Sequence, residues 1–249
     1  GVGMYRAERY VLSRTSWRGS RGGMTRGGWS YGWLFFRLQL LRVITLGLAS
    51  PYVATRLWNA RMNDAMFGSL RVEAAATWQA LFWRFVATLA ASVVIYAIVI
   101  SVLAASAINI EMFTHPTKGP PDMHTMLPVL IRIYAALIVA GLLIGLVSLF
   151  YHAAYYREIW GTTRIGTLEL AFDATAMNWL SYYVGNVLIV ALTLGLGLTI
   201  MPWRAWSFYT RHLRVAGTLD ADALLQTELA APSQGEGIAD ALGFTLLPF

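Results

Sequence analysis

Four long apolar stretches alternate with arginine-rich stretches along this chain. At about 1.5 Å per residue, a helix over any one of them would be long enough to cross the ~30 Å hydrocarbon core of a bilayer. The pattern predicts an all-α fold: a polytopic membrane protein with about four membrane segments, interfacial amphipathic helices and internal repeats. The apolar stretches are residues 33–53, 85–108, 127–151 and 182–201.

The charges that flank these stretches predict which ends face the cytoplasm. The connection between the second and third stretches, residues 109–126, is proline-rich and has no arginine, so it is expected on the outside. The first and fourth stretches have arginines on both sides, which leaves two alternatives. Either both cross fully and depart from the positive-inside rule, or both turn back as re-entrant hairpins whose backbone is covered by protein or water. Their length favours full crossings.

Both of these stretches contain the same helix-breaking sequence. Thr-Leu-Gly-Leu occurs at residues 45–48 and 193–196, and each copy is followed by a proline. Proline would leave the carbonyl four residues earlier without a donor, and the Thr45 and Thr193 hydroxyls could partly satisfy the break. The two breaks form a polar site if they meet inside a bundle; otherwise they are helix ends capped by glycine and followed by proline. The candidate site consists of Arg42, Thr45, Gly47, Pro51, Thr193, Gly195, Pro202 and Arg204.

Three arginine- and aromatic-rich stretches that follow apolar segments align with one another. Their closest match is Phe67-Gly68-x-x-Arg71 with Trp160-Gly161-x-x-Arg164. Repeats joined to membrane helices indicate one duplicated unit. The aligned stretches are residues 61–72, 155–166 and 204–215.

Composition supports a membrane location. The 249 residues are 57% hydrophobic and 13% charged, whereas soluble domains have about 25% charged residues. The formal net charge of +6 comes almost wholly from arginine, which suits phosphate headgroups, although a GC-rich genome would produce the same bias. We expect anionic lipids and other membrane-protein subunits as partners, and no nucleic acid. The absence of cysteine excludes disulfides and thiol chemistry.

The charge pattern also divides the chain into three parts. Residues 1–30 are basic and are predicted to be a cytoplasmic juxtamembrane segment. Residues 31–216 form the predicted helical membrane domain, and residues 217–249 are acidic and predicted to be a flexible tail. The chain begins at Gly1 without a signal peptide, so we expect that residues upstream are missing or processed.

Several stretches resemble one bacterial family. Residues 9–19 (Arg-Tyr-Val-Leu-Ser-Arg-Thr-Ser-Trp-Arg-Gly) and residues 45–51 (Thr-Leu-Gly-Leu-Ala-Ser-Pro) are similar to the YjgN-like family, an inner-membrane family of unknown function. Residues 163–169 resemble its Thr-x-x-Gly-x-x-Phe element. The sequence departs from the family at Tyr52, where tryptophan is usual, and at residues 199–201, which lengthen the second copy. The resemblance implies a multi-pass protein of the bacterial inner (cytoplasmic) membrane and no established activity.

The sequence lacks the motifs that are typical of catalysis: Gly-x-Ser-x-Gly, a Gly-Lys-Ser/Thr phosphate loop, and His-Glu-x-x-His. Glu111, His115, Asp122 and His124 lie close together, but their spacing fits no recognised metal site. We therefore expect no enzyme activity, no cofactor and no metal.

The apolar stretches lack the acidic residues that normally couple ion transport. This favours a structural or accessory subunit that packs on a larger membrane complex. The alternative is a transporter or channel-like protein with a site at the paired Gly/Pro helix breaks.

Overall fold

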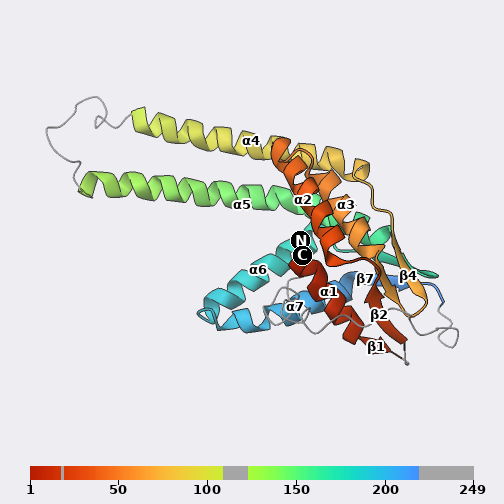
Figure 1. The fold of residues 1–249 in the computed structure, drawn as a ribbon. Coiled ribbons are helices and arrows are strands. Elements are labelled where there is room, and N and C mark those ends of the chain that lie inside the picture. Colours follow the sequence, from red (N-terminus) through yellow and green to blue (C-terminus); the bar gives the residue numbers. More distant parts are fainter. Residues whose placement is uncertain (18–19, 109–122, 219–249) are drawn as a thin grey trace. The chain divides into compact units, whose positions relative to one another are not determined.

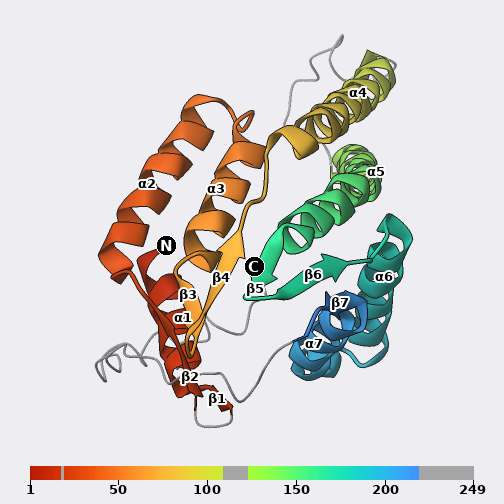
Figure 2. The ribbon, with the colours of Figure 1, turned by 90° about the vertical axis from the view of Figure 1, so that its right-hand side faces the viewer.

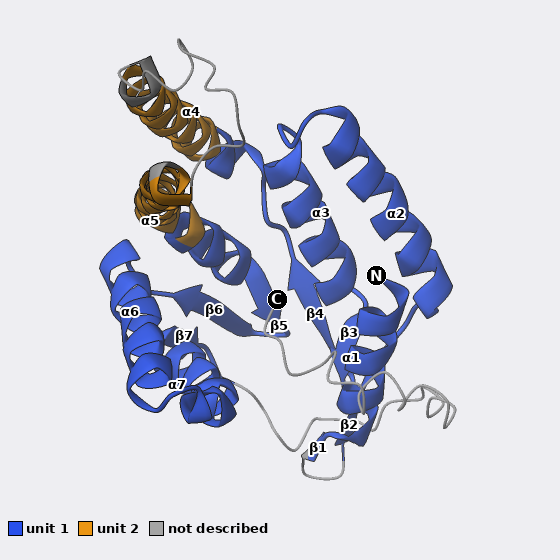
Figure 3. Cartoon of the chain, turned by 90° about the vertical axis from the view of Figure 1, so that its left-hand side faces the viewer, with its two compact units in different colours: residues 1–82, 153–249 blue, residues 83–152 orange. Residues whose placement is uncertain are grey.

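The computed structural model of the chain describes residues 1–17, 20–108 and 123–218. The chain forms two compact units, which Figure 3 draws in different colours. The first unit consists of residues 1–82 and 153–249, and the second of residues 83–152. The described residues are mostly helical, and their strands all belong to the first unit.

The helices and strands follow one another as Figure 1 shows. The α-helices are α1 (Val2–Arg14), α2 (Gly28–Ile44), α3 (Ser50–Met62), α4 (Gln79–Ile108), α5 (Met123–Gly161), α6 (Ala176–Leu192) and α7 (Met201–His212), and η2 (Leu196–Ile200) is a 3₁₀ helix. The strands are β1 (Ser16–Trp17), β2 (Ser20–Met24), β3 (Ala65–Phe67), β4 (Leu70–Ala74), β5 (Thr163–Ile165), β6 (Leu168–Phe172) and β7 (Leu213–Ala216).

The strands form an antiparallel meander in which chain order is also spatial order, from β1 to β7. Three helix pairs interrupt it: α2–α3 after β2, α4–α5 after β4, and α6–α7 after β6. Each interruption begins and ends at facing residues, since Met24 pairs with Ala65 and Phe172 with Leu213. The two ends of each pair therefore meet at neighbouring strands, so α2–α3 and α6–α7 are helical hairpins (Figure 2).

One face of the sheet is polar and the other packs on helices. Within β4 the residues alternate: Arg71 and Glu73 are exposed, whereas Ala74 is buried, as the period of a strand requires. Strands β3–β4 and β5–β6 are joined by short turns that contain Gly68 at φ +57° and Gly166 at φ +58°. Glycine adopts this left-handed conformation without the Cβ clash that other residues meet.

An aromatic cluster forms the core between β6 and helices α5, α6 and α7. The ring of buried Trp179 lies 4.9 Å from that of Tyr156 and 4.6 Å from that of Phe208. Phe172 reaches the same cluster from the sheet, with its ring 5.9 Å from those of both Tyr156 and Tyr209. Aromatic side chains bury large areas, so this cluster fixes the α6–α7 hairpin on the sheet.

Two helices among the described residues are long and apolar enough to cross a membrane: Gln79–Ala105 within α4 and Met126–Gly161 within α5. They correspond to the second and third predicted segments. The predicted first and fourth segments are not continuous helices, because α2 ends at Ile44, α6 ends at Leu192, and the chain then turns back. Four full crossings are therefore not confirmed.

The prediction of an all-α fold is wrong about the sheet. The chain is mostly helical and also contains a 7-stranded antiparallel sheet. Its strands have only two to five residues each, which is too short for a periodicity window to separate from the helices beside them. The Arg-Val and Arg-Ile pairs that the sequence alignment placed in amphipathic stretches are strand residues in β4, β5 and β7.

The three-way alignment of arginine-rich stretches does not match the structure in its register. Phe67 ends β3 and Gly68 begins the turn to β4, whereas Trp160 and Gly161 are the last residues of α5. Another correspondence is present: β2 and β6, α2 and α6, and β3 and β7 begin at a constant separation along the chain. The two Thr-Leu-Gly sequences share that separation.

The predicted N-terminal and C-terminal segments are described to different extents. Residues 1–30 form α1, β1, β2 and the first turn of α2, all within the first unit. Of the predicted acidic tail, only Gly217 and Thr218 belong to the described residues. The connection between α4 and α5 that was predicted to face outward also lies largely outside them.

Candidate functional site

Each short helical hairpin reverses through a turn of the same geometry. We name residues 45–49 the first leucine turn and residues 193–197 the second leucine turn. In the second, the Gly195 amide donates to the Val190 carbonyl over 2.8 Å and the Leu194 amide to the Ala191 carbonyl over 3.3 Å. These are the two bonds of a Schellman helix ending, in which the residue at the position of Leu194 is usually glycine.

The first leucine turn repeats this pattern. The Gly47 amide donates to the Arg42 carbonyl over 2.8 Å, and the Leu46 amide to the Val43 carbonyl over 3.0 Å. Leu46 has φ +50° and Leu194 has φ +51°, and these are the non-glycine residues with positive φ among those described. Both leucines therefore adopt the left-handed conformation that a Cβ disfavours by roughly 1–2 kcal/mol.

The threonine that precedes each leucine completes the turn. The Thr193 hydroxyl donates to the Ile189 carbonyl over 2.6 Å and accepts from the Gly197 amide over 2.7 Å. The Thr45 hydroxyl donates to the Leu41 carbonyl over 2.9 Å and accepts from the Ala49 amide over 3.1 Å. The two hydroxyls therefore bond the end of the first helix and an amide of the turn, and not the Gly47 and Leu198 carbonyls that the sequence suggested.

The two prolines do not have the effect that the sequence suggested. Pro51 and Pro202 lie in the first turns of α3 and α7, where a helix has no donor to lose. The Gly47 carbonyl accepts from the Ser50 amide over 2.9 Å, and the Leu198 carbonyl accepts from the first residue of α7. The prediction that both carbonyls lack a partner is wrong, because each proline begins a new helix and does not interrupt one.

The structure places the eight predicted site residues in two groups, on two hairpins. Figures 1 and 2 both show the α2–α3 turn and the α6–α7 turn apart from each other. Arg42 is exposed in the last turn of α2. Arg204 lies in α7, and its Nε donates to Asn186 Oδ1 of α6 over 2.7 Å, so it serves its own hairpin. The groups are Arg42, Thr45, Gly47 and Pro51, and Thr193, Gly195, Pro202 and Arg204.

The leucines at the two turns face away from the protein. Leu46 is 92% exposed and Leu194 is 94% exposed. Apolar neighbours extend each surface, because Ile44, Leu48, Leu192, Leu196 and Leu198 are also exposed. Turns of soluble proteins are usually built from Gly, Pro, Asn, Asp and Ser, so these two turns have the chemistry of a surface that contacts something apolar.

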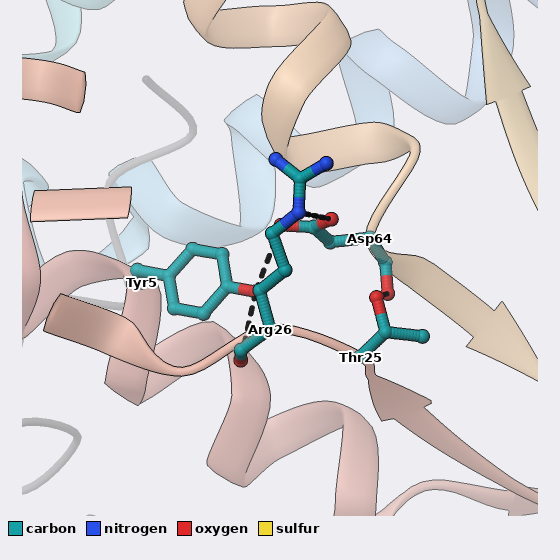
Figure 4. A network of polar contacts seen from close by, with 4 residues as sticks. All are labelled: Tyr5, Thr25, Arg26 and Asp64. Atoms are coloured by element: carbon teal, nitrogen blue, oxygen red, sulfur yellow. Dashed lines mark hydrogen bonds and ion pairs between the residues drawn. The ribbon is translucent and has the colours of Figure 1, made fainter. Parts of the chain in front are cut away.

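A buried polar cluster that the sequence did not predict joins α1 to the end of α3 (Figure 4). The Tyr5 hydroxyl lies 3.0 Å from Asp64 Oδ2, and Arg26 Nε lies 3.2 Å from Asp64 Oδ1. The Asp64 backbone carbonyl accepts from the Thr25 amide over 2.9 Å. The side chain of Asp64 is 4% exposed and that of Arg26 is 61% exposed, so the ion pair connects the cluster to the surface.

A second ion pair lies nearby and joins α1 directly to α3. Arg61 Nη1 of α3 lies 2.9 Å from Glu8 Oε1 of α1, and the Arg61 side chain is buried. The ring of Tyr5 stacks on that of Tyr31 at 4.8 Å and closes the cluster on the α2 side. The one feature of the sequence that could have pointed to this ion pair is Glu8, which is the single acidic residue among residues 1–30.

Burial shifts the pKa values of the groups in this cluster. It raises the pKa of Asp64 above the usual range, against the opposing effects of Tyr5 and Arg26. It also raises the pKa of Glu8, although Arg61 opposes the change. The pKa of Tyr5 is raised by burial and by the neighbouring Asp64 carboxylate. The cluster therefore holds α1 against α3 through charges and hydrogen bonds that are sensitive to pH.

The acidic and histidine residues whose spacing fitted no recognised metal site lie mostly outside the described residues. Among the residues that it describes, no group of three His, Asp or Glu side chains could hold a metal ion. His124 lies at the start of α5, whereas Glu111, His115 and Asp122 lie outside the described residues.

Residues 1–241 match the model of a family described as "Bacterial protein of unknown function (DUF898)". The chain belongs to this family. The match covers nearly the whole DUF898 chain and confirms the resemblance to the YjgN-like family. No curated protein matches the chain, and no solved structure matches it. The family carries no activity that could be transferred, so the function of this DUF898 chain is argued from its own geometry.

Proposed function

We propose that this DUF898 chain is an integral protein of the bacterial inner membrane and a structural or accessory subunit of a larger membrane complex. The observation that carries the proposal is the α4–α5 pair. These helices contain 30 and 39 residues, which is longer than the roughly 20 that a bilayer requires. Their apolar side chains are exposed along almost their whole length, and soluble proteins rarely expose a surface of this kind.

The charge distribution supports an orientation with the sheet in the cytoplasm. Strand β4 precedes α4 and strand β5 follows α5, so the chain leaves the sheet at the start of α4 and returns to it at the end of α5. The exposed face of the sheet carries Arg71, Arg164 and Arg214. Cytoplasmic segments near membrane helices are enriched in arginine, and arginine there also binds anionic headgroups.

The sheet also offers a surface for another subunit. Arg164 faces Glu73 and Glu169 on the neighbouring strands, and its Nη2 lies 3.0 Å from Glu169 Oε1. Strand β7 pairs with β6 on one side, and Val215 on this edge strand is exposed. An edge strand can pair with a strand of a partner. This edge and the charged face beside it support an accessory role.

The constant separation between the two sets of elements supports a duplication. The β2–α2–α3–β3 and β6–α6–α7–β7 segments each place a short helical hairpin with a leucine turn between neighbouring strands. We infer that they are copies of one ancestral unit. The α4–α5 pair lies between these two segments in the chain. Its two helices are longer than those of the short hairpins.

Labelling of single cysteines tests the topology, because the natural chain has no cysteine. Met123→Cys at the start of α5 should react with an impermeant maleimide added outside spheroplasts. Glu169→Cys on the sheet should react only after permeabilisation. Labelling of both positions from the same side would contradict a crossing by α5.

The accessory role needs a separate experiment in cells that express the chain at its natural level. A photoreactive residue at Val215 probes the sheet edge, and one at Leu142, exposed on α5, probes the membrane surface. We expect a discrete adduct with one membrane protein from at least one position. The absence of any protein adduct from both positions would contradict the role.

The alternative proposal is transport through a site at the helix breaks, and the matching geometry of the two leucine turns favours it. The turns lie on separate hairpins, so one site would need both to approach each other. Gly47→Leu and Gly195→Leu should then abolish uptake of the same substrate while each protein stays folded in the membrane.

A further inference from the structure

We propose that the second leucine turn enters the hydrocarbon of the cytoplasmic leaflet, so that α6–α7 is a half-membrane hairpin. The inference rests on the proposed membrane location. It assigns the α6–α7 hairpin contact with lipid at a second place on the protein, in addition to the α4–α5 helices. The exposed leucines of the second leucine turn are expected to contact lipid acyl chains.

The backbone amides of the turn are satisfied without water. The Thr193 amide donates to Ile189, and the Leu196 amide donates to the Thr193 carbonyl over 3.1 Å. The Gly197 amide donates to the Thr193 hydroxyl, and the Leu198 amide donates to the Gly195 carbonyl over 3.0 Å. Together with the two Schellman bonds, every amide from Thr193 to Leu198 has an acceptor within the hairpin. An unsatisfied backbone group in lipid costs several kcal/mol, whereas a turn in water can leave its amides to solvent.

The side chains of the turn are suited to lipid. Leu192, Leu194, Leu196 and Leu198 are all exposed. Transfer of a leucine side chain from water into an apolar environment stabilises by roughly 1.5–3 kcal/mol. The left-handed backbone at position 194 disfavours any residue with a Cβ. The side chain of Leu194 is exposed and makes little contact with the protein that could offset this strain. Contact with acyl chains supplies a gain that offsets this strain.

The polar residues of the hairpin set its depth. No charged residue occurs between Asp173 and Arg204, and Arg204 is hydrogen-bonded to Asn186 across the hairpin. Helix α6 rises about 10 Å from Asn186 to Thr193, compared with about 15 Å for half of the hydrocarbon core. With the Arg204–Asn186 pair at the headgroup boundary, the turn reaches into one leaflet without crossing.

The aromatic residues of α7 fit the same depth. Trp203 and Trp206 are exposed on this helix, near the level of Arg204. Tryptophan is enriched at the boundary between lipid and water. Arg211 follows at the base of the hairpin, where it can reach anionic headgroups.

Fluorescence quenching in proteoliposomes tests the inference. A single cysteine at Leu194 is labelled with the environment-sensitive fluorophore NBD, and Leu196→Cys provides a second position in the turn. Leu142→Cys on α5 is the control for the membrane interior, and Glu169→Cys on the sheet is the control for water. The vesicles contain phosphatidylethanolamine and phosphatidylglycerol, with nitroxides at shallow or deep acyl positions.

The label at Leu194 should be quenched by the acyl-chain nitroxides and not by aqueous iodide, because the turn lies about 10 Å below the headgroup boundary. The label at Leu142 should respond most to the deep nitroxide, and the label at Glu169 only to iodide. Iodide quenching at Leu194 with lipid quenching at Leu142 would overturn this inference and leave the membrane anchor intact. Protection at Leu194 from both quenchers would also overturn it, because protein would then cover the turn. Iodide quenching at Leu142 would instead contradict the proposed function.

Discussion

Arg204 joins the two arms of the α6–α7 hairpin, because its Nε donates a 2.7 Å hydrogen bond to Asn186 Oδ1. A Cβ added at Gly185 would lie 2.9 Å from Arg204 Nη2, so the guanidinium packs directly on this glycine. Arg56 of α3, in the other short hairpin, is exposed. It therefore offers an exposed arginine for comparison with Arg204.

Replacement of Arg204 should weaken the hairpin. Arg204→Ala leaves the half-buried Asn186 amide without its charged donor, and we expect a loss of about 1–3 kcal/mol in the free energy of unfolding. Arg56→Ala is the matched control and should change it by less than about 0.5 kcal/mol. Reversible denaturation in mild detergent measures both. Equal losses would show that the hydrogen bond to Asn186 is not the source.

Substitution of Thr193 tests the hydroxyl that satisfies the second leucine turn. Thr193→Val removes both hydrogen bonds at nearly constant volume and should cost about 1–3 kcal/mol, because the Gly197 amide loses its acceptor. Thr193→Ser keeps the hydroxyl and should restore most of the stability. The same pair of substitutions at Thr45 should behave alike. A stable Thr193→Val variant with an unstable Thr193→Ser variant would contradict this account.

The sequence located the two short turns, although the length of the segments favoured full crossings over helical hairpins. The positions of both turns were visible because Thr-Leu-Gly occurs twice at helix ends and a proline follows. The alternatives of crossing and turning back were also visible, since arginines flank both segments on both sides. Which alternative holds depends on the pairing of β2 with β3 and of β6 with β7, and strands this short leave little trace in a hydropathy profile.

The polar cluster could not be predicted for a different reason. Tyr5 and Asp64 are far apart in sequence and meet only because α1 packs beside α3. Glu8 was notable as an isolated acid, but its partner Arg61 was one arginine among many. Pairwise contacts of this kind follow from tertiary packing, and a single sequence carries no pattern that selects one arginine over the others.

The Glu8–Arg61 ion pair should be needed for α1 to stay bound. Arg61→Ala leaves the partly buried carboxylate of Glu8 without this partner, and we expect a loss of about 1–3 kcal/mol, less than the removal of one member of a fully buried pair costs. Arg71→Ala, at an exposed site on β4, should cost less than about 0.5 kcal/mol. Hydrogen exchange of the α1 amides provides a local readout. Unchanged protection of α1 in Arg61→Ala would contradict the prediction.

The polar cluster should make stability fall as pH rises. Burial raises the pKa values of Asp64 and Glu8 in the folded state above their unfolded values of about 3.9 and about 4.3. Between those unfolded values and the raised folded values, the folded state binds more protons, so stability decreases with increasing pH. Their contribution is therefore fully present below about pH 4 and is lost as pH passes the folded pKa values.

Thermal unfolding in detergent from pH 4 upward measures this dependence. Asp64→Asn should reduce the slope, and Asp64→Asn with Glu8→Gln should reduce it further. A double variant with the slope of the natural chain would show that other groups control the pH dependence.

The left-handed backbone at Leu194 should give glycine an advantage over alanine. Leu194→Gly and Leu194→Ala both remove the leucine side chain, so the difference between them isolates the strain at φ +51°. We expect the glycine variant to be more stable than the alanine variant by about 1 kcal/mol, because only alanine retains the Cβ clash. The order should reverse at Leu192, the last residue of α6, where glycine is disfavoured in a helix by about 1 kcal/mol.

Both variants at Leu194 should also show weaker lipid quenching of a label at Leu196→Cys, since the turn has lost a leucine that inserts. An alanine variant at Leu194 as stable as the glycine variant would mean that the turn relaxes out of this conformation, and the argument from strain would fail while the lipid contact could still be measured.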